Sequence, residues 1–154
     1  MSPLGDFCVW WYTFATRLPT HMECLESNNL IVTRRTTGKL PLLPYLKIKE
    51  AILGKKYRLD ISFVDTATSA QLHIEYKKKP GPANTLAFPY SDSDGEIIMH
   101  LETIRRQARI YDRSYHQHLM FLCIHSMLHL KGFKHGNEME EMENKFYKKF
   151  LPKK

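Results

Sequence analysis

The sequence is poor in cysteine and has no long hydrophobic run. Its 154 residues include only Cys8, Cys24 and Cys123, an odd number without any C-x-x-C pair, which argues against a disulfide framework. The longest apolar stretch near the N-terminus, FCVWWYTFA, is too short to span a bilayer and follows no basic segment of a signal peptide. We therefore expect a cytoplasmic protein with no membrane partner and no disulfide.

The sequence also lacks internal repeats and low-complexity tracts. Its length of 154 residues is typical of one domain. Hydrophobic residues make up 43% of the chain, which is ample for a core. Residues 1–28 mix aromatic residues with turn formers and show no clean periodicity. We treat them as an N-terminal segment of unclear role and place the recognisable domain at residues 29–154.

The charge is unbalanced toward the basic side. The formal net charge is +7, with 23 Lys and Arg against 16 acidic residues. Such a balance favours a polyanionic partner, nucleic acid first and an anionic membrane second. Because many basic proteins bind no nucleic acid specifically, this excess supports a function only together with a site.

Hydrophobic periodicity predicts alternating strands and helices. Strands are expected near 30–35 and 57–64, and near 85–89 and 96–100, where a short connection indicates a hairpin. Helices are expected after Pro44 and after Asp65, which would cap the second. The predicted class is α+β, with a small mixed four-stranded sheet covered by helices.

The C-terminal half reads as three helices. The first, after His100, is amphipathic and carries Arg105, Arg109 and Arg113 at four-residue spacing on one face. The second, residues 116–130, is apolar nearly all round, which is typical of a buried central helix. The third spans about 138–150.

The segment HSMLHLKGFKH predicts a metal site. His125 and His129 lie four residues apart on the buried helix, so both rings project from one face, and a turn at Gly132 brings His135 back toward them. A chance H-x-x-x-H pair is common, but burying unpaired histidines is costly, which favours metal ligation. Three imidazoles favour one Zn²⁺ per chain with the fourth position open to water, the arrangement of a catalytic site.

Residues near the three histidines indicate which side chains bind the metal and which reaction it serves. Cys123 points to the other side of the helix and should pack, while His116 and His118 are expected at the surface or beside the ligands. Ser126 stands where zinc peptidases carry a glutamate base, which weakens a peptidase assignment. A dipositive metal with neutral ligands suits an anionic phosphodiester, in agreement with the basic charge.

Three motifs in order resemble one family. HSMLHLKGFKH resembles the H-G-x-L-H-L-x-G-[YF]-D-H motif of the YbeY family of metal-dependent endoribonucleases, and the EMEEME that follows is also similar. PANTLAFP resembles the family's P-T-N-V-L-S-F-P, and DGEIIM resembles its G-D-I-x-I strand. The resemblance covers roughly residues 29–150. It implies a zinc-dependent, single-strand-specific endoribonuclease of the bacterial cytoplasm that acts with ribosomal components in ribosomal RNA maturation and ribosome quality control.

The chain departs from the family pattern at three positions. Lys77 stands where the family usually has a phosphate-holding arginine, so we expect Lys77 to act on the substrate phosphate with the same charge but without the bidentate fork. Ser126 replaces a glycine and should be tolerated in a helix, whereas Lys134 replaces an aspartate and places a cation near the metal.

Two alternative functions remain. The chain could bind RNA as a ribosome-assembly factor without cutting it, its zinc serving folding or partner docking. The groove beside the metal and the arginine stripe would then be the binding surface. A hydrolase of a peptide or small ester is chemically compatible with an open zinc site.

Overall fold

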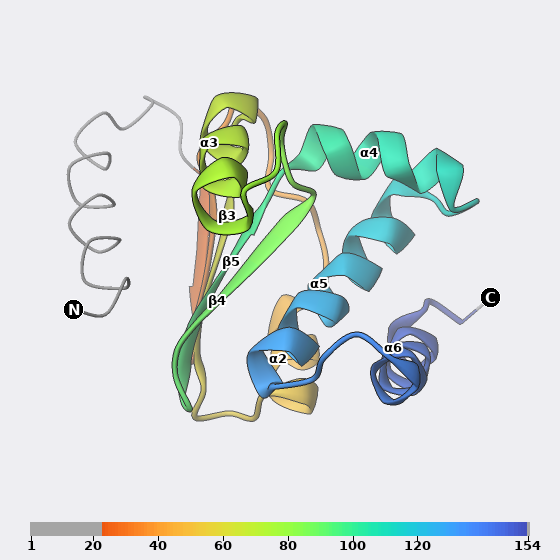
Figure 1. Ribbon diagram of the computed structural model, residues 1–154. Coiled ribbons are helices and arrows are strands. Elements are labelled where there is room, and N and C mark those ends of the chain that lie inside the picture. Colours follow the sequence, from red (N-terminus) through yellow and green to blue (C-terminus); the bar gives the residue numbers. More distant parts are fainter. Residues whose placement is uncertain (1–22, 154) are drawn as a thin grey trace.

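The computed structural model describes residues 23–153 and confirms the α+β class. The described residues form, in chain order, β1 (Glu23–Ser27), β2 (Leu30–Arg34), α2 (Tyr45–Ile52), β3 (Arg58–Phe63), α3 (Thr66–Lys77), β4 (Thr85–Ser91), β5 (Asp94–Met99), α4 (Leu101–Ile110), α5 (Tyr115–Lys131) and α6 (Asn137–Phe150). Residues 1–22 of the predicted N-terminal segment lie outside this description. Figure 1 shows the arrangement.

The sheet has five strands in the order β1-β2-β3-β5-β4. The three inner strands β2, β3 and β5 run parallel, and the edge strands β1 and β4 run antiparallel to their neighbours. The sheet is therefore mixed as predicted, and the predicted hairpin is formed by β4 and β5. The prediction of four strands is wrong, because β1 adds a fifth.

Strand β1 escaped prediction because its sequence, ECLES, shows no alternation and is exposed at four of its five positions. Backbone pairing with β2 holds this strand in place. The turn between them is formed by Asn28 and Asn29, which both have positive φ, at 37° and 63°. Asparagine tolerates this conformation and is common in two-residue hairpin turns. The sheet thus extends into the segment predicted to precede the domain.

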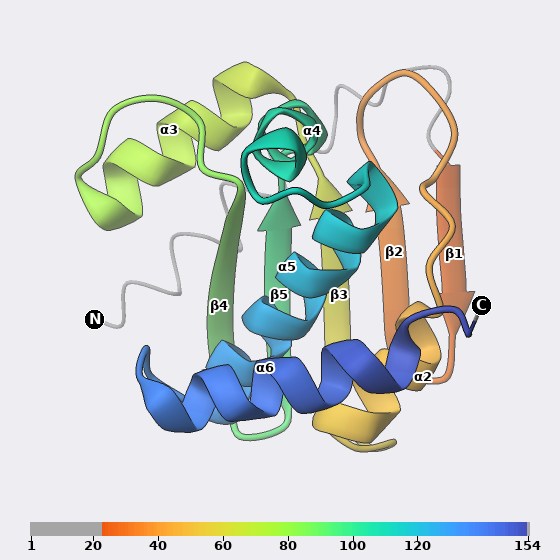
Figure 2. The same ribbon diagram turned by 90° about the vertical axis from the view of Figure 1, so that its right-hand side faces the viewer.

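Helices cover the sheet in layers. Figure 1 shows α4, α5 and α6 on one side of the sheet, and Figure 2 shows α5 crossing it with α6 below. The larger core lies on this side, where Ile61 of β3 and Ile97 of β5 pack in one cluster with Leu119 and Ile124 of α5. A smaller cluster joins Leu72 of α3 to Leu86, Phe88 and Ile98. Ile97 belongs to the larger cluster and its neighbour Ile98 to the smaller one. Because successive side chains of a strand point to opposite faces, the two clusters lie on opposite faces of the sheet.

Helix α5 is the buried central helix that the sequence predicted. Ten of its 17 residues are buried. It begins at a capping box in which the Ser114 hydroxyl accepts from the Gln117 N–H and the Gln117 side chain accepts from the Ser114 N–H. It ends at Gly132, whose φ of 106° lets the chain turn back. In residues 23–153, no helix is both long and apolar enough to cross a membrane.

Candidate metal centre and its cleft

The three predicted histidines meet at the C-terminal end of α5. His125 and His129 lie one turn apart on the helix, and the turn at Gly132 returns His135 toward them. One nitrogen from each ring lies within 4.8 Å of the other two. His125 and His129 are half-buried and His135 is exposed. Within the part of the chain that the structure describes, this is the one histidine, cysteine and carboxylate cluster with the spacing to hold a metal ion.

Hydrogen bonds on the far side of two rings fix which nitrogen is free. His125 Nδ1 lies 2.5 Å from Oε1 of Glu143, and His129 Nδ1 lies 3.0 Å from the Phe133 carbonyl oxygen. A carbonyl oxygen and an ionised carboxylate only accept, so both Nδ1 atoms carry the proton. The Nε2 atoms then present lone pairs, which is the form in which imidazole binds a metal.

The distance between these two Nε2 atoms supports the same conclusion. They lie 3.1 Å apart, although neither carries a proton to share with the other. Two nitrogens at about 2.0–2.1 Å from a tetrahedral metal are separated by about 3.3 Å. The donor set and its spacing therefore fit a metal ion between the rings.

The protonation state of His129 favours ligation. Burial, followed by the neighbouring His125, lowers the pKa of His129 below its usual value. A lower pKa keeps the ring neutral at pH 7, and only neutral imidazole offers a lone pair to a metal. The burial of His129 thus favours the neutral ring, which is the form that can bind a metal.

A cleft of ≈ 860 Å³ opens beside the three histidines. Its walls come from α3, the loop after it, β4, α4 and the end of α5, elements whose arrangement Figure 2 shows. Lys77, Lys79 and Lys134 all line it together with His125, His129 and His135. The structure thus brings Lys77, singled out from the sequence, to the same cleft as the histidines, whereas Lys78 is absent from its lining.

The other sequence expectations have mixed outcomes. Cys123 is fully buried against Met99, as predicted, and helix α5 is continuous through Ser126, whose hydroxyl lies 2.7 Å from that of Thr85. His116 is exposed, as expected. His118, however, is only 2% exposed and stacks between Tyr111 and Phe121 instead of lying at the surface.

The arginine stripe does not reach the cleft. Arg105 lies over the Tyr115 ring at 4.8 Å, and Arg113 lies over the Phe121 ring at 4.0 Å. None of the three stripe arginines lines the cleft. Arg105 and Arg113 therefore pack on aromatic side chains of α5, and the stripe does not extend the metal centre.

Several residues that support the metal centre or line its cleft were not predicted. Glu143 lies in the EMEEME segment, where nothing distinguishes it from the other glutamates until α6 folds against α5. Asn84 lies in the PANTLAFP motif, but its partner Gln107 is 23 residues away on α4. Such pairings depend on tertiary contacts that helical or strand periodicity does not encode.

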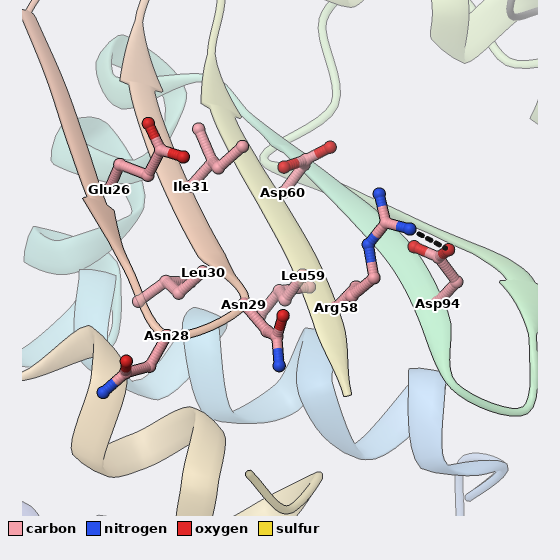
Figure 3. A pocket seen from close by; sticks show the side chains of 9 residues that line it. All are labelled: Glu26, Asn28, Asn29, Leu30, Ile31, Arg58, Leu59, Asp60 and Asp94. Carbon is pink, nitrogen blue, oxygen red and sulfur yellow. Dashed lines mark ion pairs between the residues drawn. The ribbon is translucent and has the colours of Figure 1, made fainter. Parts of the chain in front are cut away.

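A second hollow, of ≈ 240 Å³, lies at the β1–β2 turn and the adjacent ends of β3 and β5. Figure 3 shows its polar side chains, including Glu26, Asp60 and the pair of Arg58 and Asp94, whose charged atoms lie 3.8 Å apart. Within the described part of the chain, no histidine or cysteine lines it. The histidine cleft is therefore the candidate functional site.

Comparison with known proteins gives the family. The family model described as endoribonuclease YbeY matches residues 41–151. The endoribonuclease YbeY of Mycoplasmopsis synoviae is 32% identical over 112 residues, covering 66% of this chain and 69% of the relative. That of Rhizobium etli is 31% identical over 131 residues, covering 77% of this chain and 75% of the relative.

A solved structure shares the fold. The solution structure of TM1509 from Thermotoga maritima has a TM-score of 0.51 at 21% identity and covers 69% of this chain and 78% of its own. The matched family model spans both the histidine segment and β4, the strand in the cleft wall. The chain therefore belongs to the YbeY endoribonuclease family.

Proposed function

We propose that this protein is a zinc-dependent endoribonuclease that cleaves single-stranded RNA and acts in maturation of small-subunit ribosomal RNA and in ribosome quality control. The observation that carries the proposal is the convergence of three histidine nitrogens within 4.8 Å in a cleft that lysines also line. Membership of the YbeY family supports the reaction class. Association with ribosomal components and a cytoplasmic location belong to the same proposal.

Zinc is the proposed metal because of the ligand chemistry. His125, His129 and His135 supply nitrogen donors only, and a three-histidine set with an open fourth position is a known catalytic zinc arrangement. When bound, the metal would polarise a phosphoryl oxygen and lower the pKa of a coordinated water. The carboxylate of Glu143 and the Phe133 carbonyl hold two of the rings in the ligating orientation.

The remaining groups act on the substrate phosphate. Lys77, at the end of α3, and Lys79, in the loop after it, line the cleft on one wall, and Lys134 lines it next to His135. Their charges attract the RNA backbone and offset negative charge that develops at phosphorus. Lys77 carries this role in place of the family's arginine and, being a point charge, leaves the phosphate less tightly oriented.

An RNA-binding ribosome-assembly factor that does not cleave is the second candidate. The observation that favours it is that, among residues 23–153, no aspartate or glutamate lines the cleft. A carboxylate base is therefore not evident there. The same lysines would hold the RNA, and the metal would stabilise the α5–α6 turn.

The deciding experiment is an RNA cleavage assay on the purified protein loaded with Zn²⁺. Single-stranded and duplex RNA of the same sequence are compared for the parent protein, His129→Ala and His116→Ala. We expect cleavage of the single strand by the parent and by His116→Ala, whose exposed histidine lies outside the cleft, and none by His129→Ala. Binding without cleavage by all three proteins would establish the assembly factor, and full activity of His129→Ala would overturn the histidine metal centre as the site of cleavage.

A further inference from the structure

A pair of amide side chains in the cleft carries a further inference. Asn84 precedes β4 and Gln107 lies on α4, and both line the cleft with His125 and His129. The Asn84 Nδ2 atom lies 2.8 Å from Gln107 Oε1. Neither residue has a role in the metal centre or in phosphate binding as described above.

The orientation of both amides follows from one unambiguous donor. The backbone N–H of Thr85 lies 2.6 Å from Asn84 Oδ1, and because an N–H only donates, this atom of Asn84 must be the oxygen. The NH₂ group of Asn84 then faces Gln107, so the atom of Gln107 that accepts its hydrogen bond must be the side-chain oxygen. The Gln107 NH₂ group is thereby directed away from Asn84.

The position of Asn84 is itself fixed by the backbone. The N–H of His100, the residue that caps α4, donates to the Asn84 carbonyl oxygen at 3.0 Å. Strand β4, which Asn84 precedes, pairs with β5 in antiparallel register. The hydrogen bond between the two amides therefore connects the start of β4 to α4, the helix that follows β5. The pairing of β4 with β5 keeps Asn84 in position for this bond.

The Gln107 Nε2 atom is available to a ligand. It has no hydrogen-bond partner within residues 23–153 and is not among the buried polar atoms that lack one there. Gln107 is half-buried, and Thr103, one helical turn earlier, also lines the cleft. A rigidly oriented amide thus presents only N–H donors to whatever occupies the cleft.

We propose that Gln107 determines base specificity by donating to a hydrogen-bond acceptor on a nucleobase of RNA bound in the cleft. This inference rests on the proposed function, since it assumes RNA in the cleft. A base is favoured over a phosphate because the lysines already supply the positive charge that phosphates require, whereas a neutral amide adds little to their binding. Base edges differ in donors and acceptors, and a fixed donor distinguishes them.

The preferred bases follow from this chemistry. Guanine O6 and uracil O4 are acceptors at the positions where adenine and cytosine carry amino groups, whereas N7 is an acceptor in both purines. We expect Gln107 to favour guanine or uracil at one position of the bound strand. The cleft volume of ≈ 860 Å³ falls within the roughly 300–1,000 Å³ of ligand sites, which accommodates a nucleotide.

The test is the substitution Gln107→Glu. It keeps the oxygen that accepts from Asn84 and replaces the NH₂ group by a second oxygen, so the donor becomes an acceptor in nearly the same shape. The matched control is Gln117→Glu at the start of α5, outside the cleft, where the side-chain oxygen still accepts from the Ser114 N–H and the charge change is identical. If Gln107→Glu does not fold, Gln107→Met removes both donors without adding charge.

Each zinc-loaded protein is incubated with a randomised single-stranded RNA heptamer, and the bound and the cleaved fractions are sequenced separately. The parent and Gln117→Glu are expected to enrich guanine or uracil at one position. For Gln107→Glu we expect that preference to shift toward adenine or cytosine by a factor on the order of tenfold, and for Gln107→Met we expect it to disappear.

The outcomes separate this inference from the proposed function. An unchanged base profile in Gln107→Glu, or a uniform loss of binding for all sequences, overturns the base contact while leaving the nuclease intact. A shifted profile in the bound fraction without any cleavage supports the base contact and overturns the nuclease. Absence of RNA binding by the parent protein overturns both.

Discussion

The Nδ1 atom of His125 lies 2.5 Å from the Oε1 atom of Glu143, across the interface between α5 and α6. Glu143 is buried, with 8% of its surface exposed. A buried carboxylate is costly unless it is paired, and here its partner is the ring that faces the candidate metal centre. The contact therefore links the packing of the C-terminal helix to the orientation of a ligand.

The first prediction concerns this contact. Replacing Glu143 by Gln keeps the side-chain volume but removes the carboxylate charge that faces the Nδ1 atom of His125. Because groups that hold a metal-binding histidine contribute strongly to affinity, we expect zinc binding to weaken by about tenfold to a hundredfold. The measurement is competition for Zn²⁺ with a chelator of known affinity.

The matched control for this experiment is Glu141→Gln. Glu141 is exposed on the same helix. Its substitution removes the same charge as that of Glu143 but affects no contact with a histidine. Its zinc affinity should equal that of the parent protein. Equal affinities for the Glu143 and Glu141 variants would show that the carboxylate has no part in ligand orientation.

The second prediction tests Lys77. Substitution by Ala should lower kcat/KM for single-stranded RNA by about tenfold or more, because the cation that we propose to act on the phosphate is lost. Substitution by Arg restores the bidentate fork and should raise kcat/KM above that of the parent. The readout is initial rates of cleavage at several RNA concentrations.

Lys78 provides the comparison for Lys77. It is the adjacent residue, ends α3 in the left-handed conformation and does not line the cleft. Lys78→Ala should therefore keep kcat/KM near the parent value. If Lys78→Ala loses as much activity as Lys77→Ala, only the general charge of this loop matters, and the specific role of Lys77 is refuted.

The sequence alone predicts the three histidines of the metal centre but not the residues that contact them. His125, His129 and His135 could be predicted to converge because helical spacing and a glycine turn are local features. Glu143 and Gln107 could not, since each acquires its role from a partner on another element, 18 and 23 residues away. Strand β1 was missed for a related reason, because its exposed residues carry no hydrophobic pattern and pairing with β2 alone defines it.

The third prediction concerns Gly132. A Cβ atom there would meet nothing within 4 Å, so the position requires glycine for its φ of 106° and not for space. An L-residue in the left-handed region costs roughly 1–2 kcal/mol. Gly132→Ala should therefore lower the free energy of unfolding by about that amount and weaken zinc binding, because the turn places His135.

The corresponding control is Gly54→Ala, since Gly54 also has a positive φ, of 90°, and open space around its Cβ position, but follows α2 away from the cleft. Urea unfolding without metal should show a similar loss of stability in both variants. Zinc affinity should fall only in Gly132→Ala. Full zinc affinity in Gly132→Ala would mean that the turn tolerates a side chain without displacing His135.

The final prediction concerns the pH dependence of stability and rests on His118. Burial, followed by the positive charge of Arg113, lowers the pKa of this ring to about 4 in the folded protein. The unfolded chain binds a proton near the usual value of about 6.5. Above that pH the histidine is neutral in both states. As the pH falls from 6.5 toward 4, the unfolded state takes up the proton first, so the folded state loses stability.

Replacing His118 by Phe tests this directly, because an aromatic ring keeps the stacking between Tyr111 and Phe121 but cannot be protonated. The free energy of unfolding, measured in urea without metal at pH 7 and pH 4.5, should fall less in His118→Phe than in the parent. Since both proteins share all other titratable groups, the difference between the two slopes reports His118 alone. Equal slopes would show that this ring accepts a proton in the folded state as readily as in the unfolded chain, against its burial.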